Sequence, residues 1–305
     1  MRLTQIRDFL TVVETGSITA AARALGVSQP GITKSIGGLE AELAVALLQR
    51  TPRGVTLTRF GRSFYARARA AHSELDKAQQ ELLQMKGLRT GKVAVGFGPW
   101  AAALILPDAV LRFRQRYPDV ELRLLEGFGH ALFPLLRNEA LDMVMALRLP
   151  GHSKDPALRF RPVFHNEQIV VGRRGHPLTR AQSVIELAST TWLSFEPRAA
   201  VDQVLNDLGF AAARQVILCE SLNVMLGLLS DSDMLAMVSR RLLALPWARN
   251  VIEEIPTAKR MPSLTTGVYT SASALLTPAA AYMAKMLMET GRELSARRRD
   301  SADVK

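Results

Sequence analysis

The stretch TGSITAAARALGVSQPGITKSIGGLEAELAVALLQRTPRGVTLT, residues 15–58, decides the fold of the N-terminal part of this chain. Apolar residues recur at helical spacing after Ser17, a residue type that caps helix N-termini, and Gly26 then follows as a helix-ending residue. Ser28 is placed to cap a second helix, and Pro30 falls in its first turn, where a missing N–H is tolerated. We therefore expect two short helices joined by a tight turn.

The second of these helices has two different faces. An apolar stripe suited to pack on the first helix is made of Ile32, Ile36, Leu39 and Leu43. The opposite face carries small or polar residues that can reach base edges and phosphates, namely Gln29, Gly31, Thr33, Lys34 and Ser35. Val27 is expected to be the apolar plug of the turn. The pattern indicates a helix-turn-helix that places one helix in the DNA major groove, and a helical hairpin with a solvated face is the alternative.

A short basic hairpin is expected next. Val55–Thr58 alternates and is rich in β-forming residues, while Pro52–Gly54 reads as a turn with Arg53 at its tip, either entering a minor groove or simply exposed. No acidic residue occurs between Glu42 and Glu74, a span that contains Arg50, Arg53, Arg59, Arg62, Arg67 and Arg69. Such a run of one sign suits contacts with phosphates.

Composition supports a nucleic-acid partner and narrows the class of protein. The net charge of the 305 residues is +11, and residues 1–90 hold 13 Lys and Arg against 7 Asp and Glu, a basic excess about three times denser than in the remainder. The single cysteine, Cys219, cannot form an intrachain disulfide, which fits a cytoplasmic protein. The N-terminus does not resemble a signal peptide, and no stretch of about 18 apolar residues predicts a membrane span.

A long helix is predicted between the hairpin and the rest of the chain. Leu3–Glu14 should form a first helix behind the two short ones, and Arg59–Lys86 a long one ending at a Gly-containing hinge, Gly87–Gly91. The long helix carries a heptad seam made of Phe64, Ala68, Ala71, Leu75, Ala78, Leu82 and Met85. We expect this seam to pair with a second chain, and packing against the protein's own body is the alternative.

From Lys92 onward, predicted strands alternate with predicted helices. Strands are expected at residues 92–97, 120–126, 142–147, 160–165, 168–172, 192–195, 216–219, 234–238, 251–255 and 264–269. Helices are expected at 101–117 (interrupted by Pro107), 131–138, 184–188, 200–208, 222–229 and 279–295. The alternation favours a parallel α/β architecture.

These residues together resemble a known family. The N-terminal landmarks are Phe9, Gly16-Ser17-Ile18, Ala21-Ala22, Leu25, Ser28-Gln29-Pro30, Ile36, Leu39-Glu40, Leu43, Leu48, Arg50, Leu57-Thr58 and Gly61, and they resemble the DNA-binding domain of LysR-type transcriptional regulators. Individually weaker landmarks extend the resemblance over the whole chain, at Leu106-Pro107, Phe113, Tyr117-Pro118, Leu141-Asp142 and His176-Pro177-Leu178.

The resemblance implies an architecture that combines α and α/β parts. A winged helix-turn-helix would occupy 1–58, a linker (dimerisation) helix and hinge 59–90, and a two-lobed α/β effector domain similar to periplasmic binding proteins 91–305. Lobe I would span about 91–164 and 268–297, and lobe II about 165–267. Family members form dimers of dimers, so a homotetramer is expected, with double-stranded DNA and a small-molecule effector as partners and RNA polymerase as a further candidate.

The resemblance also assigns roles to single residues. Gln29, Pro30, Thr33 and Lys34 match the groove-reading positions and Arg53 the wing position, so the expected DNA-binding set is Ser28, Gln29, Pro30, Thr33, Lys34, Arg50 and Arg53. Three residues depart from the common pattern. Gly31 and Lys34 replace the commoner alanine and arginine, and Ala44 stands where glycine is frequent. Because lysine offers a point charge instead of a planar fork, these changes affect the operator sequence that is read.

The effector is expected in the crevice between the lobes, at the carboxyl ends of the strands. The first crossover, Gly96–Ala101, lacks the hydroxyl that many family members have there, so backbone groups and the Trp100 ring would act, which suits an aromatic or apolar carboxylate. Simple packing of Trp100 between the lobes, and a solvent-exposed Arg148 instead of a carboxylate counterion, are the alternatives. The expected effector-binding set is Gly98, Pro99, Trp100, Ala101, Phe128, Arg148, Phe195, Ser221 and Asn223.

The sequence predicts neither an enzyme nor a metal or cofactor site. The five histidines lack metal-binding spacing, and no nucleophile elbow, phosphate loop or dinucleotide fingerprint occurs. Cys219 lies in a predicted strand and is expected to be a buried apolar residue. A solute-binding protein with an incidental helical head, an α/β enzyme, and a regulator without an effector are the competing hypotheses.

Overall fold

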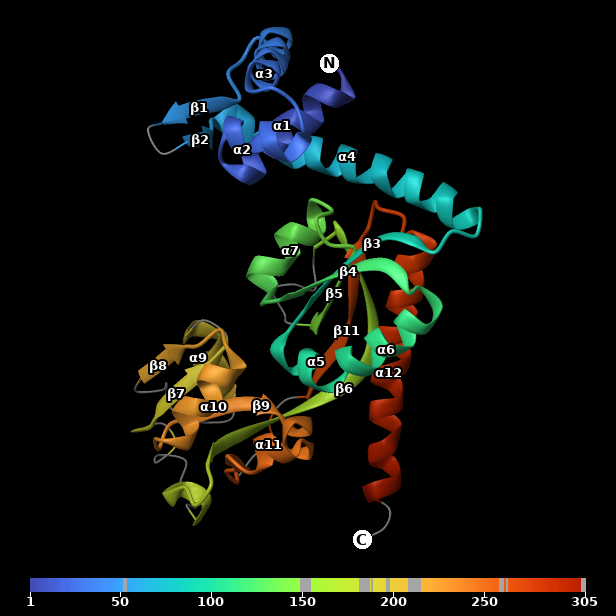
Figure 1. The fold of residues 1–305 in the computed structure, drawn as a ribbon. Helices are drawn as coiled ribbons and strands as arrows, with labels where there is room; N and C mark the ends of the chain where they lie inside the picture. Colours follow the sequence, from blue (N-terminus) through green and yellow to red (C-terminus); the bar gives the residue numbers. More distant parts are fainter. Residues whose placement is uncertain are drawn as a thin grey trace.

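The computed structural model describes residues 1–51, 54–148, 155–180, 187, 189–195, 198–207, 215–257, 261 and 263–302. A small helical head and a large mixed α/β body are joined by one long helix, α4 (Arg59–Met85) (Figure 1). The confirmed architecture is therefore helical at the N-terminus and α/β beyond residue 90.

The head is built from α1 (Leu3–Thr15), α2 (Ile18–Leu25) and α3 (Gln29–Leu43). The Oγ atom of Ser17 accepts a hydrogen bond from the backbone N of Ala20, and Oγ of Ser28 accepts one from N of Gly31, so both predicted caps form. The three helices enclose one apolar core whose fully buried members include Phe9, Val12, Ala21, Ile32, Leu39 and Leu47. Burial of this stripe sets the direction of α3.

The wing is a two-stranded antiparallel hairpin of β1 (Leu48–Thr51) and β2 (Gly54–Leu57). The backbone N of Val55 donates to O of Gly16 over 2.9 Å, which docks the wing on the turn between α1 and α2. A Cβ atom on Gly54 would lie 2.5 Å from that same carbonyl oxygen, so only glycine allows this approach. Arg53, the predicted tip residue, lies outside the described residues.

Two expectations for the head are wrong. Val27 is not an apolar plug, because this residue is 44% exposed whereas Ala21 and Ala22 of the preceding helix are buried. Ser35 does not belong to the outward polar face either. Its Oγ atom donates to Oδ2 of Asp8 in α1 over 2.6 Å, so the side chain is used within the head.

Helix α4 packs on the body by a face other than its apolar seam. Ser73, Lys77, Gln80 and Gln84, spaced along one side of the helix, make hydrogen bonds to residues of the body. The seam beyond Ala68 is left uncovered, since Leu75 is 48%, Leu82 61% and Met85 74% exposed. The helix does pack against the protein's own body, as the alternative states. It does so through its polar face, and the seam takes no part in this contact.

Nine strands of the described residues form one mixed sheet. Its order is β4-β3-β5-β11-β6-β9-β7-β8, with β10 also paired to β6. The bounds are β3 (Thr90–Phe97), β4 (Asp119–Glu126), β5 (Met143–Leu147), β6 (Leu158–Arg173), β7 (Thr191–Ser194), β8 (Gln215–Leu218), β9 (Leu235–Ser239), β10 (Ile252–Glu254) and β11 (Ser263–Ser271). Strand β6 crosses the middle of the body and belongs to both of its halves (Figure 1).

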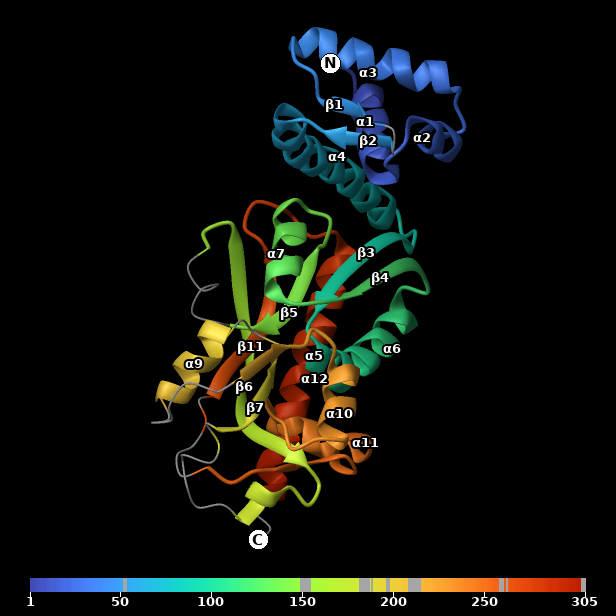
Figure 2. The ribbon, with the colours of Figure 1, turned by 90° about the vertical axis from the view of Figure 1, so that its left-hand side faces the viewer.

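Two apolar lobes lie on either side of this crossover. Lobe I comprises β3, β4, β5, β11 and the first half of β6, covered by α5 (Pro99–Leu104), α6 (Leu106–Arg116), α7 (Gly129–Arg137) and α12 (Pro278–Ala302). Lobe II comprises β7 to β10 and the second half of β6, covered by α9 (Arg198–Asp207), α10 (Leu222–Ser230), α11 (Pro246–Arg249) and the short turns η2 (Pro177–Arg180) and η3 (Arg240–Ala244). In Figure 2, lobe II lies on the side of lobe I that faces away from the head.

The sheet differs from the predicted parallel arrangement in two ways. Strands β3, β4 and β5, and strands β7, β8 and β9, do pair in parallel, but β11 and β6 run antiparallel to their neighbours. The two strands expected at 160–165 and 168–172 are one strand, because the crossover continues through residues 166 and 167 without a turn. The helix expected at 101–117 breaks at Ile105, and a new helix begins at Leu106 with Pro107 in its first turn.

The predicted helix at 184–188 falls largely outside the described residues. No helix in the described part of the chain combines the length and apolar character that crossing a membrane requires.

Candidate DNA interface and candidate effector site

The N-terminal turn of α3 presents most of the predicted DNA-binding residues on one open surface. Ser28, Gln29, Pro30 and Lys34 are exposed and Thr33 is half-buried, while the buried stripe faces the other way. Arg50 lies in β1 of the wing. The exposed groups are donors and acceptors of the kind that contact bases and phosphates.

A polar network behind α3 was not predicted. Asp8 is buried in α1, where its Oδ1 pairs with the Arg7 guanidinium at 3.0 Å and its Oδ2 accepts the hydroxyl proton of Ser35. Asp8 and Ser35 are 27 residues apart, so no local pattern in the sequence connects them. The network fixes α3 against α1 and so orients the exposed surface.

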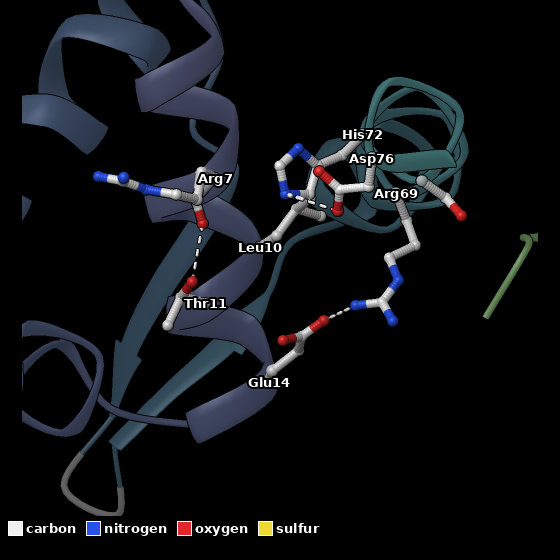
Figure 3. Close-up of a pocket in the computed structure, with 8 residues that line it drawn as sticks. Arg7, Leu10, Thr11, Glu14, Arg69, His72 and Asp76 are labelled. Carbon is white, nitrogen blue, oxygen red and sulfur yellow. Dashed lines mark hydrogen bonds and ion pairs between the residues drawn. The ribbon is translucent and has the colours of Figure 1, made fainter. Parts of the chain in front are cut away.

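A crevice lies between α1 and α4, at the base of the head (Figure 3). Its charged side chains all have partners: the Arg69 guanidinium contacts the Glu14 carboxylate, Nε2 of His72 lies 3.7 Å from Oδ2 of Asp76, and Arg7 pairs with Asp8. Burial lowers the pKa of Arg69, and the charge of Arg123 lowers it further. Because these charges are mutually compensated, we do not place the effector here.

The predicted effector residues of lobe I gather where β3 ends. Gly98, Pro99 and Ala101 are buried at the start of α5, and Trp100 is half-buried with its ring edge-on to Phe164, centroids 6.1 Å apart. Trp100 and Phe164 pack with the helices α5, α6 and α12, on one face of lobe I. This packing lies within lobe I, whereas the alternative interpretation placed Trp100 between the lobes.

The two lobes touch through aromatic and charged side chains. The rings of Phe128 and Phe195 stack with centroids 5.2 Å apart, and Nε2 of His130 lies 3.0 Å from Oε1 of Glu220. The structure thus brings together two predicted effector residues from different lobes. His130, which follows Phe128 in a stretch that is also a candidate for the cleft, completes that contact with Glu220, which sequence reasoning missed.

Other predicted effector residues lie apart from Trp100. Arg148 is exposed at the end of β5, and its guanidinium lies 5.2 Å from the centre of the Phe160 ring, which packs on the α7 face of lobe I. Ser221 caps α10 by accepting a hydrogen bond from N of Val224, and Asn223 is exposed. The structure therefore does not assemble Trp100 and Arg148 into one site.

Two fully buried polar atoms at the crossover are unsatisfied within the described residues. The Asn166 side chain accepts a 2.5 Å hydrogen bond from Oγ of Ser239, but its Nδ2 has no partner, and neither has Oγ1 of Thr266. Thr266 is the register partner of Phe164, so both polar groups lie on the strands next to the Trp100 contact. Buried groups without partners cost free energy and are candidates for ligand contacts.

A buried ion pair joins α4 to lobe I. Nζ of Lys77 lies 2.9 Å from Oε2 of Glu139, and both side chains are at most 10% exposed. Burial lowers the pKa of Lys77, but the hydrogen bond and charge of Glu139 outweigh it and leave that pKa raised. Burial raises the pKa of Glu139 and also that of the neighbouring Asp142.

Among the residues that the structure describes, no group of three or more His, Cys, Asp or Glu side chains is arranged so that it could hold a metal ion. Cys219 is buried, and its Sγ donates to the backbone O of Ser221.

Comparisons with known proteins match both parts of the chain. The family model described as "Bacterial regulatory helix-turn-helix protein, lysR family" matches residues 3–62, and the one described as "LysR substrate binding domain" matches residues 86–292. The HTH-type transcriptional regulator GalR of Pseudomonas putida is 31% identical over 90% of this chain and 70% of its own. The SDS degradation transcriptional activation protein of a Pseudomonas species is 28% identical over 94% of this chain and 95% of its own.

Solved structures show the same fold. A full-length OxyR variant from Pseudomonas aeruginosa superposes with a TM-score of 0.71 at 23% identity, covering 96% of this chain and 95% of that one. Full-length CbnR in complex with its target DNA superposes with a TM-score of 0.66 at 19% identity, covering 95% of this chain and 100% of that one.

Proposed function

The chain belongs to the LysR family of DNA-binding transcriptional regulators, and from that premise we propose that it binds its operator through α3 and the wing and responds to an aromatic or apolar carboxylate held between the lobes. The exposed N-terminal turn of α3, held over a buried stripe and followed by an arginine-rich segment, is the observation that supports operator binding most strongly. The relatives are named as transcriptional regulators, which supports a non-enzymatic role, and we place that role in the cytoplasm, where the DNA is.

Operator binding is tested with the DNA upstream of the gene that encodes this chain. We expect a specific complex whose association constant falls steeply between 50 and 200 mM salt, because each neutralised phosphate releases counterions (a slope of about −0.9 per contact). An unrelated fragment of equal length is the control. Equal affinity for both fragments, or a complex insensitive to salt, would contradict sequence-specific binding by this surface.

The effector class is supported by the chemistry around the crossover. Trp100, Phe128 and Phe195 offer aromatic surface near the junction of the lobes, and the unsatisfied Nδ2 of Asn166 and Oγ1 of Thr266 offer polar partners. An aromatic acid presents one apolar ring and one polar end, which matches both kinds of group. Because the Arg148 guanidinium lies over Phe160, its service as counterion requires a different side-chain rotamer.

A thermal-shift comparison of carboxylates with their amides tests this class. Benzoate and cinnamate are expected to raise the melting temperature in proportion to the logarithm of their concentration, and benzamide and cinnamamide much less, since only a native-state ligand stabilises the fold. Asn166→Ala is expected to weaken the benzoate shift, and Asn223→Ala measures the contribution of the exposed asparagine that belongs to the predicted effector set. Equal shifts with acid and amide would exclude a carboxylate-selective site.

The same family premise leads us to propose a dimer of dimers. The uncovered seam of α4 is one apolar surface that a second chain can cover. Exposed apolar side chains also flank both edge strands of the sheet, Leu111 and Leu124 near β4 and Ile217, Leu218 and Val224 near β8. A two-fold pairing that sets the β4 edge of one effector domain against the β8 edge of another would bury both.

A further inference from the structure

Helix α7 connects the two places where lobe I meets other parts of the molecule. Its N-terminal end carries the contacts with lobe II, and its C-terminal end carries the contact with α4. The nine residues of α7 form one helix, about 14 Å long at 1.5 Å per residue, with Pro134 inside it. One helix therefore reaches from the contact between the two lobes to the helix that carries the DNA-binding head.

The contacts at the N-terminal end are ones that lobe movement would break. The Phe128 ring stacks on Phe195 of lobe II, and His130 pairs with Glu220 of lobe II. His130 and Glu220 have side chains 61% and 49% exposed, so this ion pair opens and closes at small cost. We call Phe128, His130, Phe195 and Glu220 the latch.

The contacts at the C-terminal end are buried and constrained. Glu139 has φ +60°, a left-handed conformation that costs a residue with a side chain on the order of 1 kcal/mol, yet it is held there. Its carboxylate pairs with Lys77 at 2.9 Å, Lys77 also pairs with Glu74 at 3.2 Å, and the carbonyl O of Glu139 accepts the Ser73 hydroxyl at 3.1 Å. We call Ser73, Glu74, Lys77 and Glu139 the junction.

The body of α7 is packed tightly enough to move as a unit. Leu132, Phe133 and Leu136 are at most 2% exposed and pack on Leu141, Val144 and Tyr269. Pro134 lacks the N–H that would donate to the helix carbonyl four residues earlier, so this side-chain packing is what transmits a displacement from the first turn to the last.

We propose that α7 couples the latch to the junction, so that the relative position of the two lobes sets how α4 is held against lobe I and hence how the DNA-binding head is presented. This proposal rests on the proposed function in one respect: the effector would be the ligand that moves the lobes. The mechanical link itself requires no ligand. Because coupling between two sites is reciprocal, a change at either end must be felt at the other.

Hydrogen exchange of the full-length chain tests the coupling without an effector. Glu220→Ala and His130→Ala each remove the latch ion pair, one from each lobe, and because both side chains are largely exposed we expect both variants to fold. We expect either variant to speed amide exchange over residues 73–84 of α4 about threefold or more. Lys77→Met removes the junction pair and is expected to speed exchange over residues 128–132 and 219–224.

Glu121→Gln is the matched control. It removes an exposed ion pair with Lys92 at 3.0 Å, also in lobe I, which touches neither end of α7. Unchanged exchange at the far end in both the latch variants and the junction variant, or changes equal to those of Glu121→Gln, would refute the coupling. Failure of the wild-type chain to bind its upstream DNA would instead refute the proposed function. The exchange experiment uses no DNA, so it would still test the coupling.

Discussion

The hydroxyl of Ser35 donates a 2.6 Å hydrogen bond to the buried carboxylate of Asp8, and this bond ties the middle of α3 to α1. The opposite face of α3 presents Gln29 and Lys34 to solvent. The orientation of the candidate reading surface thus depends on a bond formed on the far side of the same helix.

Ser35→Ala is expected to destabilise the head. A hydrogen bond to a buried charged group contributes about 1.5–3 kcal/mol, and its loss leaves one oxygen of Asp8 without its partner. Urea denaturation followed by circular dichroism measures the change. The comparisons are Ser35→Cys and Thr11→Ala. The hydroxyl of Thr11 is exposed and donates only to its own helix. Equal stability of Ser35→Ala and Thr11→Ala would contradict the expectation.

Lys34→Ala is expected to weaken operator binding and to reduce its salt dependence. If Lys34 contacts a phosphate, the slope of log K against log salt becomes less negative by about 0.9. If it contacts a guanine, affinity is lost mainly on the operator and not on unrelated DNA. Fluorescence anisotropy at several salt concentrations distinguishes the two. Lys92→Ala, in lobe I, is the control, and identical binding by both variants would remove Lys34 from the interface.

Ala44→Gly is expected to stabilise the protein. Ala44 ends α3 with φ +54°, and the left-handed conformation costs alanine about 1–2 kcal/mol. Glycine has more conformational freedom than alanine in the unfolded chain, which offsets part of this gain. The free energy of unfolding is therefore expected to rise by about 0.5–1 kcal/mol. Ala41→Gly, inside the same helix, should instead lose about 1 kcal/mol. Two changes of the same sign would show that Ala44 is not strained.

Leu82→Glu is expected to disrupt self-association. The Leu82 side chain is 61% exposed on the seam of α4, and a buried carboxylate at an apolar helix pair is strongly unfavourable. Sedimentation velocity should show a smaller species than wild type. Gln79→Glu adds the same charge to an exposed position of α4 off the seam. A wild-type assembly that both variants retain would mean that the seam is not an interface.

Asp142→Asn is expected to change how stability depends on pH. Burial raises the pKa of Asp142, so the folded state holds its proton to higher pH than the unfolded state does. The free energy of unfolding contributed by this group therefore falls as pH rises from near 4 through the raised pKa, and the full penalty applies above it.

Asparagine keeps an oxygen to accept the 2.8 Å hydrogen bond from N of Ala94 but carries no charge. The stability of Asp142→Asn relative to wild type should therefore increase from pH 4 towards pH 8 in urea titrations. Glu121→Gln, at an exposed carboxylate of the same lobe, should show a much flatter difference. A constant difference for Asp142→Asn would show that burial does not raise this pKa.

Local patterns were sufficient to predict the elements of the head. Caps at Ser17 and Ser28, a left-handed glycine at Gly26 and an apolar stripe at helical spacing are short-range features, and each acts within one or two turns of its own helix. The alternation of strands and helices after Lys92 was equally readable, because burial of one face imposes its period on the sequence.

Only the tertiary structure decided how distant segments meet. The continuous crossover strand β6, the pairing of Ser35 with Asp8, the Lys77–Glu139 junction and the His130–Glu220 latch each join residues or strands whose partners lie far away in the sequence. Single polar residues have many equivalent partners until the chain is folded, so their sequence positions carry no signal. The sequence alone determined which surfaces would be apolar, polar or basic, and the fold decided which of them face each other, because contact depends on the path of the whole backbone.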